Sequence, residues 1–141
     1  MPIRPQRRWL YPIDWRELSQ WVRFVRAKGC CQACGRPHGQ LVNHLGDGRW
    51  WDDATCCWRS GKGRPLRNLP ALACDAGVQT TRVVLAAAHL DHDPGNNRAS
   101  NLRAYCQRCH MLHDKPEHLR QRHITYLKRR ALGDLFTGRY P

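Results

Sequence analysis

Apolar positions near the start of the chain recur every three or four residues, which is typical of one face of an α-helix. They comprise Trp15, Leu18, Trp21, Val22 and Val25. Asp14 and Glu17 form a capping-box pattern before this stripe, and Gly29 follows it as a helix terminator. The pattern therefore predicts a helix over 15–28 whose apolar face packs into the core.

The middle of the chain carries the pattern of strands and turns. Leu41–Leu45 and Arg49–Trp51 flank a Gly-Asp-Gly sequence and predict a hairpin. Thr80–Leu90 is rich in Val, Thr and Leu and predicts a strand. After an Asp-Pro-Gly-Asn turn, a second short strand is expected near Leu102–Tyr105.

The last third of the chain predicts two helices. The first begins at about Gln107, and the second begins around Pro116 with either Asp114 or Lys115 as its cap. We expect the second helix to reach about Leu132, because Gly133 follows it.

The charge of the chain points to a polyanionic partner. There are 24 Lys and Arg residues against 11 Asp and Glu, with a formal net charge of +13. The excess gathers at the two ends, since residues 1–29 and 115–141 each hold seven basic and two acidic residues. Nucleic acid is the expected partner, with DNA favoured and RNA as the alternative.

The cysteines are expected to be metal ligands. The first residues lack an apolar signal core, and no apolar run approaches the ~18 residues of a membrane span. We therefore expect a cytoplasmic protein with no membrane partner. Eight cysteines in a reducing compartment favour metal binding over disulfides.

Two Cys-x-x-Cys pairs predict a shared zinc site formed by Cys31, Cys34, Cys106 and Cys109. Each spacing lets both sulfurs reach one tetrahedral ion. Because 72 positions separate Cys34 from Cys106, the segment between them must loop out and return. One alternative is a site made by the second pair with His110 and His113, and another is that the cysteines are ordinary buried thiols.

Residues 89–113 hold the parts needed for metal-assisted phosphodiester hydrolysis. His92 can accept a proton from water near neutral pH. Asp91 can hold a divalent cation, and His110 at the start of the next helix can reach the same ion. His113 or Asp114, three and four residues later, offers a third ligand, with His113 preferred.

This stretch resembles the HNH nuclease family, also called the ββα-metal or His-Me finger family. The resemblance rests on the Asp91-His92 pair, Asn101-Leu102, and His110 after the second Cys-x-x-Cys; it covers 31–35 and 83–114, about a quarter of the chain. It implies that His92 is the general base and that Asn101 tethers the loop holding it. It also implies DNA cleavage and a four-cysteine zinc site.

The cofactors expected from this chemistry are Mg²⁺ or Mn²⁺ at the catalytic site, with Zn²⁺ or Ni²⁺ also suited to mixed oxygen and nitrogen ligands, and structural Zn²⁺ at the cysteines. Arg98, Arg103 and Arg108 surround the site in sequence and are candidates for phosphate contacts. His89 shares a strand face with Asp91 and is a candidate ligand or supporting residue.

The expected fold is α+β: a ββα-metal finger stapled by a four-cysteine zinc site, with flanking N- and C-terminal helices and a β-rich insert. We expect one domain, divided into a basic lead and helix (1–29), a zinc knuckle (30–38), the insert (39–80), the HNH core (81–114) and a basic C-terminal helix (115–141). The expected function is a metal-dependent DNA endonuclease, with specificity supplied by a homodimer or a protein partner. The alternative is a non-catalytic zinc-containing nucleic-acid-binding module, or a structural subunit of a phage, defence or mobile-element assembly.

Overall fold

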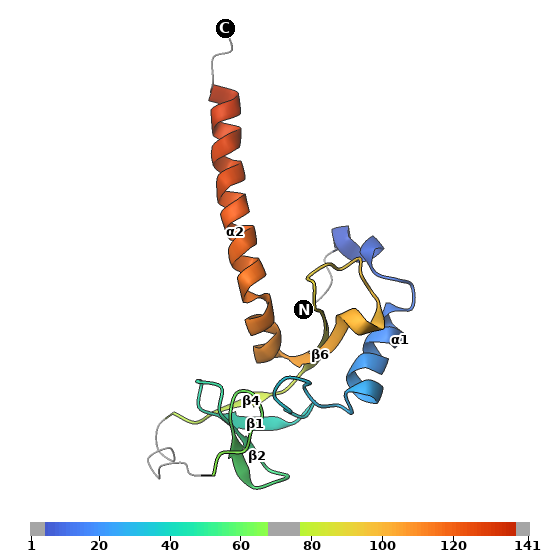
Figure 1. The fold of residues 1–141 in the computed structure, drawn as a ribbon, viewed down its shortest axis with the longest axis vertical. Helices are drawn as coiled ribbons and strands as arrows, with labels where there is room; N and C mark the ends of the chain where they lie inside the picture. The colour runs from blue at the N-terminus through green and yellow to red at the C-terminus, as the bar shows by residue number, and fades with distance from the viewer. Residues whose placement is uncertain (1–4, 68–76, 138–141) are drawn as a thin grey trace. The chain divides into compact units, whose positions relative to one another are not determined.

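A computed structural model of the chain describes residues 5–67 and 77–137, with side chains described up to residue 131 (Figure 1). The chain divides into two compact units, Met1–His110 and Met111–Pro141, and each is described by itself. Helices and antiparallel sheets are both present, so the expected mixed α and β architecture is confirmed.

The N-terminal segment is helical. A 3-10 helix, η1 (Pro5–Leu10), precedes α1 (Trp15–Gln20), which continues as a π-helix, η2 (Trp21–Arg26). The helix begins where the apolar stripe begins, and the chain leaves it at Lys28 and Gly29, both with positive φ. The predicted capping box is wrong, because the Asp14 side chain makes no capping hydrogen bond.

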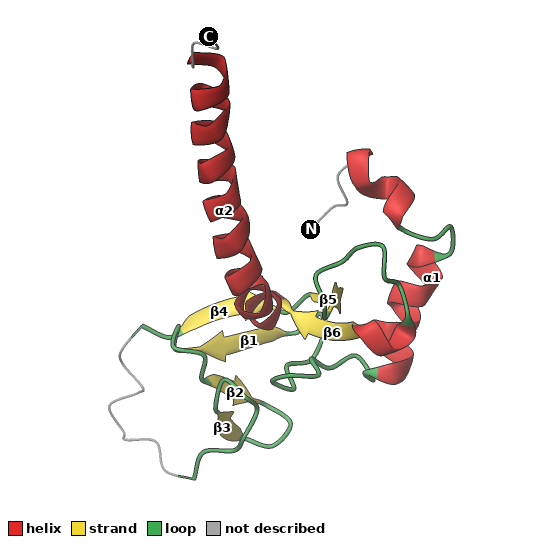
Figure 2. Ribbon diagram, turned by 45° about the horizontal axis from the view of Figure 1, so that its top comes forward, coloured by secondary structure: helices red, strands yellow, loops and turns green. Residues whose placement is uncertain are grey.

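The insert forms a four-stranded antiparallel sheet in the order β3-β2-β1-β4 (Figure 2). Its strands are β1 (Leu41–His44), β2 (Trp50–Asp52), β3 (Cys57–Arg59) and β4 (Gln79–Arg82). The predicted hairpin is confirmed, since β1 and β2 pair with His44 opposite Trp50.

A second, two-stranded antiparallel sheet joins β5 (Leu85–His89) to β6 (Leu102–Cys106). A short 3-10 helix, η4 (Ala99–Asn101), lies between them. The single strand predicted over 80–90 is therefore wrong. The Val83 carbonyl accepts a hydrogen bond from the Gly39 N–H of the insert (2.7 Å). The next residue, Val84, donates from its N–H to the side chain of Gln107 (3.0 Å). The chain changes sheets between these two residues.

The C-terminal segment is one helix, α2 (Gln107–Thr137), with Pro116 inside it. The predicted boundary at 114–115 and the predicted end at Gly133 are both wrong. A proline removes one backbone hydrogen bond of a helix. The helix nevertheless continues on both sides of Pro116. None of the helices in the described segments has the length and apolar character needed to cross a membrane.

The buried side chains of the first unit form two clusters. One surrounds the paired Cys-x-x-Cys motifs and includes Trp50, Val83 and Leu85. The other joins Val22 of η2 to Leu102 and Ala104 of β6. The first cluster links the insert to the cysteines, and the second holds the N-terminal helix against β6.

Candidate functional site: a four-cysteine centre and the Asp91 loop

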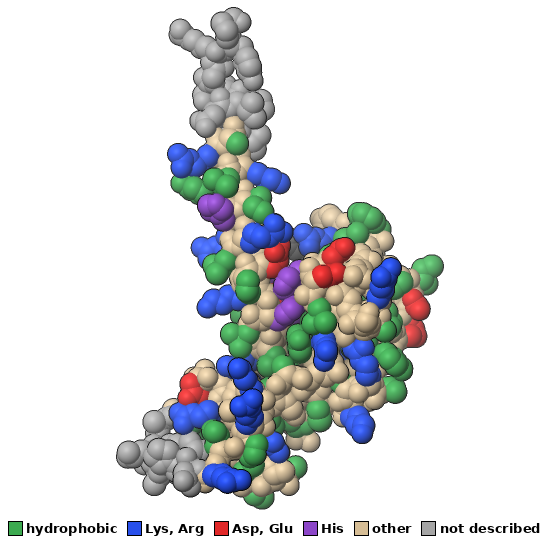
Figure 3. Space-filling view, viewed as in Figure 1, with side chains coloured by type: hydrophobic (Ala, Val, Ile, Leu, Met, Phe, Trp, Pro, Cys, Tyr) green, Lys and Arg blue, Asp and Glu red, His purple; other side chains and the backbone are tan. Residues whose placement is uncertain are grey.

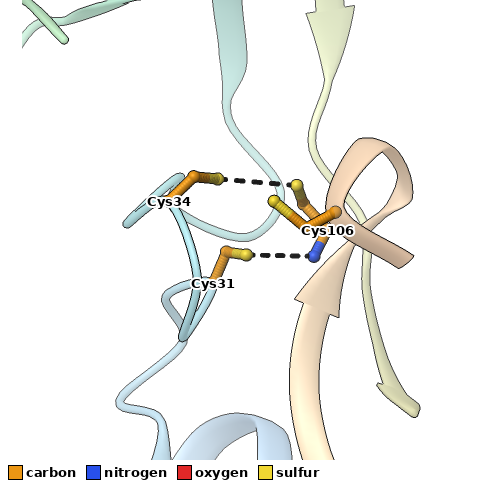
Figure 4. Close-up of side chains that lie close together, drawn as sticks. Cys31, Cys34 and Cys106 are labelled. Carbon is orange, nitrogen blue, oxygen red and sulfur yellow. Dashed lines mark hydrogen bonds between the residues drawn. The ribbon is translucent and has the colours of Figure 1, made fainter. Parts of the chain in front are cut away.

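The two cysteine pairs meet in the core of the first unit. Cys31, Cys34, Cys106 and Cys109 are all buried, and their sulfurs lie within 4.8 Å of one another. The sulfurs of Cys34 and Cys106 are 3.6 Å apart, and the backbone N–H of Cys106 donates to the Cys31 sulfur at 3.3 Å (Figure 4). The predicted grouping of these four cysteines is confirmed.

This group has the geometry of a metal site. Four sulfurs at about 2.3 Å from a tetrahedral zinc ion would be separated by ~3.8 Å, which agrees with the spacing observed here. The group can therefore hold a structural metal ion such as zinc. Mutual hydrogen bonding separates the cysteine pKa values: a hydrogen bond from Cys109 lowers the pKa of Cys106 to about 6, while the hydrogen bond with Cys106 raises that of Cys34.

The first pair sits in a tight turn fixed to β6. Gly35 has φ of +79° and donates from its N–H to the Cys31 carbonyl at 2.8 Å. Gln32 bonds twice to Ala104, through its backbone N–H and its side-chain oxygen, both at 2.9 Å. This pairing brings the first two cysteines to the strand that ends at Cys106.

Two arginines tie the metal-ligand segments to the insert. Arg36 is buried; it donates to the Gly48 carbonyl at 3.2 Å and lies 5.8 Å from the Trp50 ring centre. Arg108 lies against the backbone of Gly48 and Gly61; a Cβ at Gly48 would collide with its guanidinium, and one at Gly61 would lie 3.2 Å from it. Arg108 thus has a packing role that its sequence neighbourhood did not indicate.

The Arg36 and Arg108 charges act on one further residue of the insert. Burial, followed by the charges of Arg36 and Arg108, lowers the pKa of His44. His44 contacts the Thr81 hydroxyl at 2.9 Å and accepts from Gly46 N–H at 3.2 Å. Its role in these contacts is to join β1 to β4 and to the hairpin turn.

The loop between β5 and β6 is organised around the Asp91 carboxylate. Asn101 donates to one carboxylate oxygen at 2.8 Å and Asn96 to the other at 2.7 Å. The Asp93 N–H adds a third hydrogen bond at 3.0 Å, and Asp91 N–H donates back to the Asn101 side chain at 3.2 Å. The loop therefore brings Asp91 and Asn101 together, and it adds Asn96, for which the sequence favoured a turn role.

These donors stabilise the ionised form of an exposed carboxyl group. The Asn101 amide, the Asp93 N–H and the Asn96 amide together lower the pKa of Asp91 to about 2. Asp91 therefore carries a full negative charge, in a fixed orientation, throughout the neutral range.

His92 follows directly in an unusual backbone conformation. Its φ is +61°, in the left-handed region that residues other than glycine seldom adopt. Its N–H points to the His89 carbonyl at 3.4 Å, and its side chain is half-buried. Backbone strain of this kind costs about 1–2 kcal/mol and is concentrated at functional positions.

His89, the candidate ligand or supporting residue of the sequence analysis, makes packing contacts with the N-terminal segment. Its ring stacks on Trp15 at 5.4 Å and meets Tyr11 edge-on at 5.9 Å. It also contacts the Asn97 side chain at 3.0 Å, and Asn97 donates to the Leu10 carbonyl at the same distance. His89 and Asn97 therefore attach the N-terminal segment to the Asp91 loop.

Arg26 holds the other end of that loop. Its guanidinium donates to the carbonyls of Ala99 (2.6 Å) and Leu102. No local pattern in the sequence reveals this contact, which spans 73 residues. Only the packing of η2 on β6 brings the two segments together.

The remaining predicted residues lie on α2, before η4 and on β6. His110 is half-buried in the first turn of α2, and His113 is half-buried in the second unit. Arg98 and Arg103 are exposed, one before η4 and one on β6. Among the described cysteines outside the metal-binding group, Cys30, Cys56 and Cys57 join no cluster of three potential ligands, and Cys74 lies outside the described residues.

Comparison with protein-family models, with curated proteins and with solved structures gave no match to this chain.

Proposed function

We propose that this protein is a metal-dependent endonuclease of the HNH type that hydrolyses DNA phosphodiester bonds. The observation that carries the proposal is the Asp91 carboxylate, which is exposed, ionised and oriented by Asn96 and Asn101. His92 follows it in a strained turn, between two antiparallel strands and ahead of a helix. A fixed carboxylate suits a hard divalent cation, and histidine is the usual general base near neutral pH.

A carboxylate combined with histidine nitrogens is a ligand set that suits a divalent cation. Asp91 would hold the ion, with His110 as the proposed nitrogen ligand from the first turn of α2. When bound, Mg²⁺ or Mn²⁺ would neutralise charge on the phosphate and the departing oxygen, and Zn²⁺ or Ni²⁺ would also suit the mixed ligands.

The proposed chemical step is a single hydrolysis. A water oxygen forms a bond to phosphorus as its proton passes to the imidazole of His92. The bond between phosphorus and the 3′ oxygen breaks, and this oxygen takes a proton from solvent. Asn101 contributes by holding Asp91, while Arg98 and Arg103 are the exposed arginines proposed to contact the phosphates.

We assign zinc to the four cysteines in a structural role. A zinc ion with four thiolates carries a net charge of −2, and a buried charge needs compensation. Arg36 follows Cys34 by two residues and Arg108 precedes Cys109 directly. One positive charge therefore lies close in sequence to each of the two cysteine pairs.

A second candidate function is a zinc-containing module that binds nucleic acid without cutting it, alone or as a subunit of a larger assembly. The four cysteines and the exposed basic residues of α2 favour it, because neither feature needs Asp91 or His92. The fixed Asp91 carboxylate has no role in that function, and for this reason we prefer the nuclease.

The test is relaxation of supercoiled plasmid by zinc-loaded protein with Mg²⁺, with Mn²⁺ or with no added cation. A strong chelator is avoided because it would also remove zinc from the four cysteines. The base is tested with His92→Gly, since glycine accepts the left-handed backbone that alanine would keep under strain. We expect cation-dependent nicking by the wild type and its loss in His92→Gly and Asp91→Asn.

The matched control is His118→Ala, which removes an exposed histidine of α2 and should leave nicking unchanged. Nicking by His92→Gly at the wild-type rate would refute the assignment of the base. A wild-type protein that binds DNA but never cuts it would favour the non-catalytic module.

A further inference from the structure

One face of α2 combines a row of cations with a row of apolar side chains. Lys115, Arg122 and Arg129 recur every seven residues, as do Leu112, Leu119 and Tyr126. At about 100° per residue, each row spans only ~40° of the helix surface, and the two rows lie side by side. We call these six residues the basic face of α2.

The basic face is open to solvent. Leu119 and Tyr126 are 53% and 55% exposed, which is high for large apolar side chains. Lys115, Arg122 and Arg129 are exposed as well. Figure 3 shows blue cationic and green apolar side chains along this helix. The face is therefore not part of the core of its own unit.

Acidic residues lie off this face. Glu117 is turned about 160° away from Lys115, and it pairs with Arg120 at 2.8 Å. Asp114 lies about 100° from Lys115 around the helix axis. The cations of the basic face are thus arranged for a partner that brings its own negative charge.

The spacing also argues against a second copy as that partner. Residues 112, 119 and 126 alternate with 115, 122 and 129 at the three- and four-residue steps of a coiled coil. A parallel self-pairing through this seam would place Lys115, Arg122 and Arg129 opposite their own copies, and like charges there are repulsive.

We propose that the basic face of α2 docks on double-stranded DNA, with Arg122 and Arg129 contacting phosphates and Tyr126 lying against the groove. This inference rests on the proposed function and names the element that would hold its substrate. The major groove of B-form DNA admits an α-helix, whereas the deep, narrow major groove of an RNA duplex does not admit side chains. Arg130 lies 5.6 Å from the Tyr126 ring centre and adds a fourth positive charge beside it.

The experiment measures binding of the full, zinc-loaded chain to a labelled DNA duplex by fluorescence anisotropy, at several salt concentrations and without Mg²⁺ or Mn²⁺. Because no cleavage is needed, the outcome is independent of whether the protein is a nuclease. Arg122→Gln/Arg129→Gln removes two charges from the basic face. Arg120→Gln/Lys128→Gln removes two charges from other sides of the same helix.

We expect the basic-face variant to weaken binding severalfold and to reduce the slope of log affinity against log salt by about 2, since each phosphate contact contributes about 0.9. The control variant should keep the wild-type slope, and an RNA duplex should bind more weakly than DNA. Equal losses in the two variants would overturn the proposal, as would tighter binding to the RNA duplex or to anionic lipid vesicles. Concentration-dependent dimerisation that the basic-face variant strengthens would also contradict it.

Discussion

At the scale of single residues, three donors fix the orientation of the Asp91 carboxylate. Asn101, Asn96 and the Asp93 N–H all donate to it. We predict that Asn101→Ala raises the pKa of Asp91 from about 2 toward its ordinary value near 4. NMR titration of the Asp91 carboxyl carbon measures the change, with Asn43→Ala on β1 as the control.

The lowered pKa of Asp91 also makes the folding stability of the protein depend on pH. Because the folded protein lowers the pKa of Asp91, its contribution to stability is present above the ordinary pKa of an aspartate. That contribution is lost as the pH falls from about 4 through 2, and Asn101→Ala should shrink it. An unchanged Asp91 titration in Asn101→Ala would show that the tether does not control this carboxylate.

Residue identity and spacing revealed only part of this site. The four cysteines could be grouped from sequence because a two-residue gap suits one metal ion. The sequence does not reveal the contacts of Asn97, Arg26 and Arg36, because their partners lie far along the chain or are backbone carbonyls. A polar residue near an apolar stripe looks the same in sequence whether it faces solvent or holds a carbonyl.

At the scale of elements, the cysteine turn depends on close packing against the insert. A side chain at Gly63 would lie 2.7 Å from the Cys34 carbonyl oxygen, while one at Gly46 would meet nothing within 4 Å. Both glycines have similar positive φ, of 79° and 74°. A comparison of alanine variants at these two glycines therefore distinguishes the effect of a steric collision from the effect of backbone strain.

We predict that Gly63→Ala lowers the free energy of unfolding by about 1–3 kcal/mol more than Gly46→Ala does, because only the former collides with the cysteine turn. Chemical denaturation measures both, and metal content should fall only in Gly63→Ala. Equal destabilisation by the two variants would mean that the insert does not support the cysteine centre.

The elements themselves followed sequence pattern where local signals agreed. Alternating strands around a Gly-Asp-Gly turn gave the β1–β2 hairpin. The split between β4 and β5 was missed because Val83 and Val84 have equal strand propensity, and only long-range pairing divides them. The predicted helix boundary at 114–115 was wrong because Pro116 costs only one backbone hydrogen bond, which does not end a helix with intact turns on both sides.

At the scale of the molecule, the cysteine centre joins segments more than 70 residues apart. We predict that Cys106→Ser abolishes metal binding and cooperative thermal unfolding, because a structural zinc site supplies folding free energy of about 10 kcal/mol or more. Metal analysis and calorimetry test this, with the exposed Cys56→Ser as control. A metal-free Cys106→Ser protein with wild-type stability would refute a structural metal at these cysteines.

The proposed function requires that the Asp91 loop cuts DNA with His92 as its base. The most direct measurement is single-turnover cleavage of a labelled duplex in Mn²⁺, with wild type and His92→Gly at concentrations that saturate binding. We expect cleavage by the wild type and a loss of at least about 100-fold in His92→Gly, the usual contribution of a general base. Equal cleavage rates at equal occupancy would contradict it.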